Sequence, residues 1–310
     1  MFLTQDFGKI YNLYFNFYVL NNLRKVITKD GSISFRSEKF NENFHSLLGA
    51  FYETKNKFIN PSRLNRFKNK SINVLDICFG IGYNSALLFE NLLIGYSSLN
   101  WYGLEIDKRP LKYALTEEKF KDLWNPKVIE ILNSLNSKGF YRNKKFDCRL
   151  VLGDARKEIQ KLPNAVNFDL IFLDGFSPQK CPEIWSHEFL SKLKNKIKYQ
   201  GYLITYTSSA AVRKSLKNLG FNIFNISPTI QKKNLWSNGT LATFDNQQNN
   251  PYITHLSEME KEHLKTKASI PYRDPTGDLI SEEILEIRKK EQLSSNLLNT
   301  NLWRKKWEMA

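Results

Sequence analysis

Residues 73–85, Asn-Val-Leu-Asp-Ile-Cys-Phe-Gly-Ile-Gly-Tyr-Asn-Ser, constrain the fold more than any other segment of the chain. A short apolar run around Asp76 leads into a tight turn with Gly80 and Gly82, and a helix is predicted from 83 to 92. Glycine allows the backbone of such a turn to approach a nucleotide-like ligand closely. The order of strand, glycine turn and helix therefore predicts a ligand site at the end of this strand.

Acidic residues follow three later strand-like segments. Glu105 and Asp107 lie in Leu-Glu-Ile-Asp, Asp154 lies in Leu-Gly-Asp-Ala, and Asp174 lies in Leu-Asp-Gly-Phe. The carboxyl ends of neighbouring parallel strands meet at one edge of a sheet. We therefore expect these side chains and Asp76 to share that edge.

The middle of the chain alternates between strand-like and helix-like segments, which indicates an α/β fold. The predicted strands are 73–77, 101–105, 147–152, 168–173, 201–206, 221–226 and 239–244. The predicted helices are 83–92, 110–122, 155–162, 183–197 and 209–218. The last two strands have no helix between them, which predicts an antiparallel hairpin. This layout is typical of the Rossmann-like fold of class I methyltransferases, with a seven-stranded, mostly parallel sheet and helices on both faces.

Three regions are expected along the chain: an N-terminal extension on the substrate side, 1–70, a methyltransferase-fold domain, 71–248, and a C-terminal extension that packs on it, 249–310. The first region contains an extended piece at 32–37 and a helix-like run at 44–58. The last contains a predicted helix near 281–292, which has acidic residues in its first turn and basic residues near its end. That charge order matches the helix dipole.

Composition argues against several classes of protein. No apolar run reaches the roughly 18–20 residues of a membrane-spanning helix, and the aromatic segment 10–20 lacks the features of a signal peptide. The three cysteines and four histidines show no spacing typical of a metal site. We therefore expect a cytoplasmic monomer that uses no metal and does not bind a membrane.

The formal net charge of +15 comes entirely from residues 1–254, which hold 36 basic and 21 acidic residues. The densest basic segment, 55–70, has six Lys or Arg and no acid. Clustered basic residues gain affinity for a polyanionic partner through counterion release. A genome composition that favours Lys and Asn explains the excess equally well, and both interpretations stay open.

A ligand with a ribose and an adenine but no phosphate fits the glycine turn better than a dinucleotide does. The turn lacks the full Gly-x-Gly-x-x-Gly pattern, and no basic residue follows it for a phosphate. S-adenosylmethionine meets this condition, and its cationic sulfonium suits a site rich in Asp and Glu. The residues predicted to bind it are Asp76, Gly80, Gly82, Asn84, Glu105, Asp154 and Asp174.

Each of these carboxylates has a functional and a structural interpretation. Asp76 holds the ligand's amino group or orients the glycine turn, and its structural alternative is bracing of the loop. Glu105 is placed to bind ribose hydroxyls, with Asp107 as the nearest alternative. Asp154 suits a hydrogen bond from an adenine amino group and also suits the N-cap of the next helix.

Asp174 is the predicted catalytic residue. At the end of its strand, a carboxylate can hold an attacking amine beside the methyl donor and accept its proton. An Asp-Gly turn is the structural alternative. Phe176 and Trp185 are predicted walls for a nucleobase, and the other predicted substrate-binding residues are Ser177, Lys180, Glu38, Arg63, Arg66 and Lys68.

Four motifs resemble those of the MnmC-type tRNA methyltransferases, which make 5-methylaminomethyl-2-thiouridine. In order, they lie at 30–53 (Asp-Gly-Ser to Glu53), 78–85, 174–185 and 271–275. The resemblance implies methyl transfer from S-adenosylmethionine to the aminomethyl group of a wobble uridine in tRNA. Cys78 stands where many methyltransferases have the first glycine of the loop. Bifunctional members continue into a flavin-dependent oxidase domain, so the chain resembles the stand-alone form.

Two other interpretations remain. One is an aminopropyltransferase-like enzyme, or another small-amine methyltransferase, of the same fold. The high positive charge suits the acidic polyamine pocket of an aminopropyltransferase poorly. The other is a non-catalytic RNA-binding module with a degenerate nucleotide site, which the full set of acidic and glycine residues disfavours.

Overall fold

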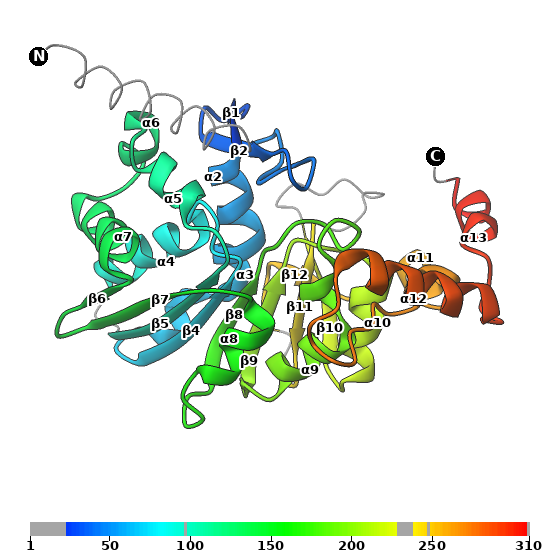
Figure 1. Ribbon diagram of the computed structural model, residues 1–310. Helices are drawn as coiled ribbons and strands as arrows, with labels where there is room; N and C mark the ends of the chain where they lie inside the picture. Colours follow the sequence, from blue (N-terminus) through cyan, green and yellow to red (C-terminus); the bar gives the residue numbers. More distant parts are fainter. Residues whose placement is uncertain (1–22, 96–97, 228–237, 247–248, 309–310) are drawn as a thin grey trace, which may run out of the picture.

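Residues 23–95, 98–227, 238–246 and 249–308 are described by the computed structural model (Figure 1). The aromatic segment 10–20 lies outside these residues. Within the described ranges, no helix is long and apolar enough to cross a membrane.

Among the described residues, the central sheet has nine strands in the order β12-β10-β11-β9-β8-β4-β5-β7-β6. Its inner strands run parallel, whereas β6, β10, β11 and β12 are antiparallel to their neighbours. The seven predicted strands are present, and the short edge strands β6 and β12 are additional. The bounds are β4 Ser71–Ile77, β5 Ser98–Glu105, β6 Phe140–Arg142, β7 Phe146–Leu152, β8 Phe168–Leu173, β9 Ile197–Thr205, β10 Asn222–Ile226, β11 Thr240–Thr243 and β12 Ile253–Thr254.

Helices cover both faces of this sheet (Figure 1). Successive side chains of a strand point to opposite faces. In β4, Val74 joins one buried cluster with α4 and α7, while Leu75 joins another with α8, α9 and α10. The bounds are α4 Tyr83–Ile94, α5 Arg109–Ala114, α6 Glu118–Lys121, α7 Pro126–Lys138, α8 Ala155–Lys161, η3 Pro182–Trp185, α9 His187–Lys194 and α10 Ala210–Asn218.

Two predicted helices differ from the structure. The segment 110–122 forms two short helices, α5 and α6, and 183–197 divides into η3 and α9. The helix α7 was not predicted, although its boundaries are marked in the sequence. Asn125 caps its first turn through a hydrogen bond from the Lys127 amide, and Gly139 ends it at a φ of 78°. A side-chain cap and a left-handed glycine are common at these positions.

The N-terminal region forms a small antiparallel sheet, β1-β2-β3, above the carboxyl ends of the central strands (Figure 1). The predicted extended piece at 32–37 corresponds to β2. The predicted run at 44–58 becomes helical only from Ala50, and it continues as a π-helix. The bounds are β1 Leu23–Ile27, β2 Ile33–Ser37, β3 Glu42–Asn43, α2 Ala50–Glu53, η1 Thr54–Ile59, α3 Asn60–Ser62 and η2 Leu64–Phe67.

The C-terminal region packs beside α10 and η3 and supplies the edge strand β12. A buried ion pair of 2.8 Å joins Arg213 of α10 to Glu260 of α11. The predicted helix near 281–292 is α12. The bounds are α11 Glu258–His263, η4 Lys267–Ser269, α12 Ser281–Ser294 and α13 Thr300–Lys306.

Candidate active site

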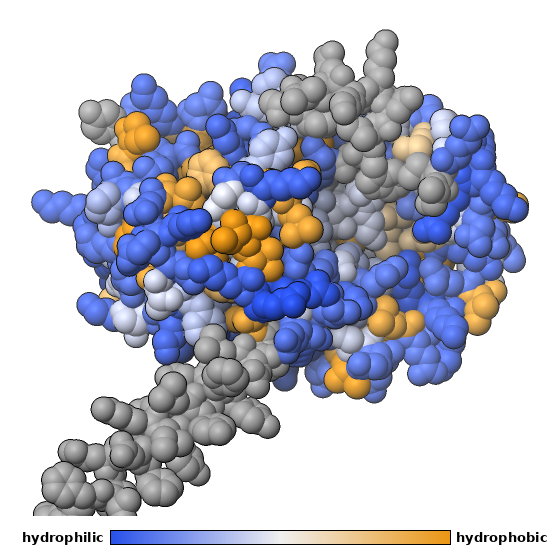
Figure 2. Space-filling view, turned by 90° about the horizontal axis from the view of Figure 1, so that it is seen from above, coloured by the Kyte–Doolittle hydropathy of each residue, from blue (hydrophilic) through white to orange (hydrophobic). Residues whose placement is uncertain are grey.

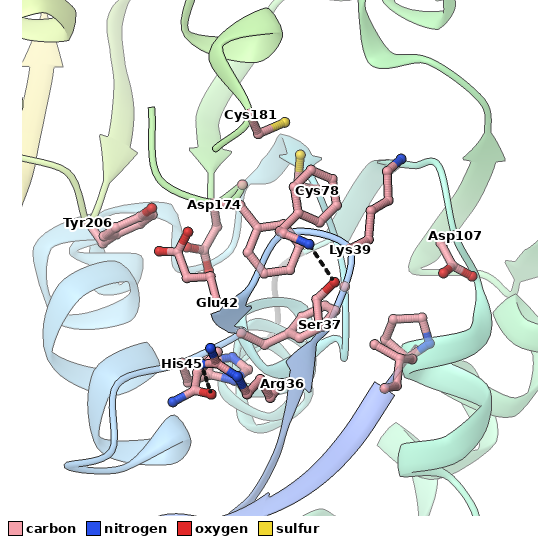
Figure 3. A pocket seen from close by; sticks show the side chains of 18 of the residues that line it. Arg36, Ser37, Lys39, Glu42, His45, Cys78, Asp107, Asp174, Cys181 and Tyr206 are labelled. Carbon is pink, nitrogen blue, oxygen red and sulfur yellow. Dashed lines mark hydrogen bonds between the residues drawn. The ribbon is translucent and has the colours of Figure 1, made fainter. Parts of the chain in front are cut away.

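A cavity of about 760 Å³ opens at the carboxyl ends of β4, β5 and β8. The order of the strands reverses between β4 and β8, and α/β sheets bind their ligands at such a point. The turn between β2 and β3 forms the opposite wall (Figure 3). Figure 2 looks down on this end of the molecule, where hydrophobic patches lie among hydrophilic side chains. The volume suits a small-molecule ligand.

The glycine turn forms the floor of the cavity beside α4. Gly80 and Gly82 have φ values of 58° and 95°, which glycine adopts without strain. A Cβ atom at Gly82 would lie 2.7 Å from the Phe79 ring. Cys78 lines the cavity and has a φ of 62°, which is uncommon for a residue with a side chain. The loop therefore keeps a left-handed conformation even where cysteine replaces glycine.

Glu105 connects the end of β5 to this turn. One carboxylate oxygen accepts a hydrogen bond of 2.7 Å from the Gly80 amide, and the other accepts bonds of 2.8 Å from the Ile106 and Asp107 amides. Burial raises the pKa of this carboxyl, while the three backbone donors oppose the increase. Glu105 and Asp107 both line the cavity. Asp107 is held by Arg109 at 2.6 Å.

Asp76 lies beneath the turn and is not among the residues that line the cavity. Its carboxylate accepts a 2.5 Å hydrogen bond from Ser85, whose hydroxyl in turn accepts one from Trp101. Burial raises the pKa of Asp76 to about 7. This position suits bracing of the loop, and binding of the cofactor by Asp76 stays a prediction.

Asp154 caps α8 by accepting a 2.9 Å hydrogen bond from the Arg156 amide. The Arg156 guanidinium bridges Asp154, at 2.7 Å, and the buried Asp274, at 2.8 Å. Burial acts to raise the pKa of Asp154, but the Arg156 hydrogen bonds outweigh it and the pKa is lowered. Asp154 does not line the cavity in this structure. Its predicted contact with adenine therefore stays a prediction.

Asp174 lines the cavity at the end of β8, as Figure 3 shows. Its carboxylate accepts a 2.7 Å hydrogen bond from the Asn84 side chain, and Asn84 accepts one from Thr54. Burial, followed by the nearby Glu53 carboxylate, raises the pKa of Asp174 to about 8. A carboxyl with such a pKa can exchange a proton with an amine near neutral pH.

Three residues near Asp174 were not among the predicted site residues. Glu42, Glu53 and Tyr206 all line the cavity. Glu53 pairs with Lys57 at 2.5 Å and also accepts a hydrogen bond from the Ser46 amide. Glu53 belongs to the first motif that resembles MnmC-type proteins, so that motif was its available signal. Glu42 lies in the gap between Phe40 and His45 of that motif and had no signal of its own. Tyr206 ends the predicted strand 201–206, with no other signal.

Three of the predicted substrate-binding residues follow β8, and only Phe176 among them lines the cavity. Phe176 lines the cavity and stacks on Phe40 with ring centroids 4.3 Å apart. The Ser177 amide donates a 3.0 Å hydrogen bond to Glu42. Trp185 is fully buried and donates a hydrogen bond to the Phe176 carbonyl, so it supports the loop from behind.

The remaining predicted residues, Glu38, Lys180, Arg63, Arg66 and Lys68, do not line the cavity. Arg66 lies beside the middle of β9, with its guanidinium 3.8 Å from the centre of the Tyr202 ring. It also donates a hydrogen bond to the Gln200 carbonyl. Some of the basic segment 55–70 thus contacts the protein itself, and its role toward RNA stays a prediction.

The residues at the cavity fit S-adenosylmethionine. Gly80 lines the cavity with its backbone at a φ of 58°, where a side chain would be strained. Carboxylates on both sides of the turn suit a cationic ligand. Among the described residues, no group of three or more His, Cys, Asp or Glu side chains could hold a metal ion.

Comparison with known proteins gives the family. A profile of S-adenosyl-L-methionine-dependent methyltransferases matches residues 118–243. An uncharacterised protein from Methanocaldococcus jannaschii is 30% identical over 283 residues, covering 88% of this chain and 74% of that protein. The bifunctional tRNA 5-methylaminomethyl-2-thiouridine biosynthesis protein MnmC from Campylobacter hominis is 30% identical over 195 residues, covering 59% of this chain. The chain spans only 28% of that bifunctional protein's length.

Among solved structures, the crystal structure of MnmC2 from Aquifex aeolicus superposes with a TM-score of 0.75 at 30% sequence identity. The match covers 88% of this chain and 86% of that chain. It extends over most of both chains, so the likeness reaches beyond the sheet into the N- and C-terminal regions. The chain therefore belongs to the MnmC-type family of S-adenosylmethionine-dependent methyltransferases.

Proposed function

We propose that this protein methylates the primary amine of a 5-aminomethyl group on the wobble uridine of tRNA. The reaction converts 5-aminomethyl-2-thiouridine to 5-methylaminomethyl-2-thiouridine. The observation that carries this proposal is Asp174, a cavity carboxyl with a pKa raised to about 8. The names of the MnmC relatives, which refer to this modified uridine, support the choice of acceptor.

In the proposed mechanism, Asp174 positions the amine and takes its proton. S-adenosylmethionine, when bound, supplies a methyl group on sulfonium sulfur, which becomes a neutral thioether when the amine nitrogen forms the new bond. Gly80 and Glu105 would hold this donor from the floor of the cavity. The amide of Asn84 fixes one Asp174 oxygen, which leaves the other for the amine. Positioning of this kind contributes more to the rate than the proton transfer alone.

Aromatic rings supply the place for the uridine. Phe40 and Phe176 are stacked at the wall formed by the turn between β2 and β3. Phe44 packs edge-on against Phe176, with ring centroids 5.0 Å apart. Single nucleobases that leave their stack are commonly bound against aromatic side chains. The N-terminal extension, residues 1–70, would then lie on the tRNA side, as its sequence suggests.

The remaining partners follow from the same proposal. We expect a monomer in the cytoplasm, where the basic half of the chain contacts tRNA phosphates without reading sequence. An aminopropyltransferase-like activity and a non-catalytic RNA-binding role are less well supported. The family profile describes S-adenosylmethionine-dependent methyltransferases, and Asp174 has the setting of a working base.

The direct test uses tRNA that carries 5-aminomethyl-2-thiouridine. We expect incubation with the protein and S-adenosylmethionine to convert this nucleoside to its methylamino form, detected by mass spectrometry of the digested tRNA. Transfer RNA that lacks the aminomethyl group is the control and should gain no methyl group. If the protein binds S-adenosylmethionine but leaves the aminomethyl nucleoside unchanged, the proposed acceptor is wrong.

A further inference from the structure

Three oxygen-bearing side chains face one corner of the cavity, next to the α4 residue Asn84. They belong to Asp174 at the end of β8, Glu42 at the start of β3 and Tyr206 just beyond β9. Figure 3 shows the three side chains together, with the Tyr206 hydroxyl directed toward the two carboxylates. The corner is therefore assembled from three segments that are distant in the sequence.

Each of these side chains keeps an oxygen for a ligand. The Asn84 amide donates to one Asp174 oxygen at 2.7 Å, and the Ser177 amide donates to one Glu42 oxygen at 3.0 Å. Within the described residues of the chain, no hydrogen-bond donor reaches the second oxygen of either carboxylate or the Tyr206 hydroxyl. Glu53 differs, because Lys57 and the Ser46 amide occupy both of its oxygens.

A primary ammonium group matches this arrangement. It carries three N–H donors, as the lysine side chain does, and the corner offers three acceptors when Asp174 is ionised. Once Asp174 has taken one proton, the other two N–H groups are left for Glu42 and Tyr206, and the nitrogen lone pair is free to attack. A secondary ammonium has one donor fewer and a substituent in its place. One acceptor would then lose its partner, at a cost typical of a buried unpaired polar group.

We propose that Glu42, together with Tyr206 and Asp174, selects a primary amine over a substituted one. This inference rests on the proposed function and adds the residue that determines specificity. The disfavoured acceptors are the methylated product and an amine that carries a carboxymethyl group. The carboxymethyl form is disfavoured twice, because its own carboxylate would lie beside Glu42. Like charges at close range in a site of low dielectric repel strongly.

Glu42→Gln tests this proposal without removing the contact to the loop. Glutamine is of equal size, and its carbonyl can still accept the Ser177 amide hydrogen. The substrates are two anticodon stem-loop RNAs that differ only at the wobble uridine, one with a 5-aminomethyl and one with a 5-carboxymethylaminomethyl group. We expect kcat/KM for the aminomethyl RNA to fall roughly 10- to 100-fold, the usual effect of a lost charged hydrogen bond. The carboxymethyl RNA should bind several-fold more tightly, measured as a competitive inhibitor.

A lower kcat/KM for one RNA and tighter binding of the other separate recognition from structural damage. Structural damage would weaken the interaction with both RNAs. Tyr206→Phe should lower kcat/KM for the aminomethyl RNA. It should not tighten binding of the carboxymethyl RNA, because it removes no charge. Glu130→Gln on the exposed face of α7 removes the same charge far from the cavity and should change neither RNA. Suppose that the wild-type enzyme methylates the aminomethyl RNA and that Glu42→Gln keeps the wild-type preference for this RNA over the carboxymethyl RNA. That result would overturn this inference and leave the proposed function intact. A wild-type enzyme that leaves the aminomethyl RNA unmethylated would overturn the proposed function instead.

Discussion

The two sides of the cavity hold their carboxylates in different ways. On the side that we propose for the methyl donor, here called the donor side, Glu105 accepts hydrogen bonds from three backbone amides, and Asp107 is paired with Arg109. On the side that we propose for the substrate amine, here called the acceptor side, Asp174 and Glu42 each accept one amide hydrogen bond and have a second oxygen without a donor among the described residues. Both carboxylates of the donor side therefore have their oxygens fixed by the protein, whereas each carboxylate of the acceptor side has only one oxygen fixed in this way.

This difference has an energetic consequence. Three carboxylates, Asp174, Glu42 and Glu53, lie near Tyr206, with Lys57 as the cation paired to Glu53. Burial together with the Glu53 charge raises the pKa of Asp174 to about 8. Unsatisfied polar groups cost stability, and such cost is common at sites that are prepared for a ligand. A cationic acceptor would relieve the repulsion among the carboxylates of the acceptor side.

The largest effect is expected from Asp174→Asn. This change keeps the size and the contact region of the side chain but removes the proton acceptor. Methyl transfer should fall roughly 10²–10⁴-fold, the range typical of a positioned acid–base group. Single-turnover measurement with bound tRNA isolates this step from binding. Affinity for tRNA should change little, since phosphate contacts dominate it.

A near-normal single-turnover rate for Asp174→Asn would show that Asp174 is only a turn residue and does not take the proton of the amine. The matched control is Asp278→Asn, which changes an exposed aspartate outside the cavity and should keep the wild-type rate.

Glu105→Ala should have the next largest effect, which we expect only on the affinity for the methyl donor S-adenosylmethionine. It removes the carboxylate proposed to accept hydrogen bonds from the ribose hydroxyls, a loss that typically costs about 1–3 kcal/mol, and it releases the Gly80 amide in the glycine turn. Calorimetry should therefore show weaker binding of S-adenosylmethionine, roughly in proportion to that cost. Asp107→Ala, measured beside it, decides between the two residues proposed for the ribose hydroxyls. Unchanged donor affinity in Glu105→Ala would contradict the view that the donor side is built around this carboxylate.

The donor side could be predicted from the sequence because its signals are local. Gly80 and Gly82 follow β4 within a few residues, and Glu105 ends a strand that is apolar and easily recognised. For Asp76 and Asp154, the sequence gives the strand end but not the direction of the side chain. Each also has a structural interpretation from the sequence, Asp76 as a loop brace and Asp154 as a helix cap, and those are the positions they occupy here.

The acceptor side was only partly predictable. Asp174 and Phe176 follow a clear strand, but Glu42 lies in a strand of two residues and reaches the cavity only through the antiparallel sheet of the N-terminal region. Tyr206 looks like any residue at the end of a buried strand. The basic residues were misleading in one respect, because charge alone did not reveal that Arg66 stacks on Tyr202. The positions of Glu42, Tyr206 and Arg66 depend on contacts between segments that are distant in the sequence, so no local sequence pattern predicts them.

A last effect concerns stability and distinguishes the two sides without an RNA substrate. The pKa of Asp174 is raised from 3.8 to about 8 in the folded protein, so the folded state binds a proton more tightly than the unfolded state. The stability linked to this proton is fully present below about pH 4 and is lost as the pH rises toward 8. Asparagine cannot titrate, so the unfolding temperature of Asp174→Asn minus that of the wild type should increase across this window. Asp278→Asn should give a flat difference, and a flat difference for Asp174→Asn would mean that the acceptor side carries no such cost. Saturating S-adenosylmethionine should reduce the slope for Asp174→Asn, because a cation beside Asp174 favours its charged form in the folded protein.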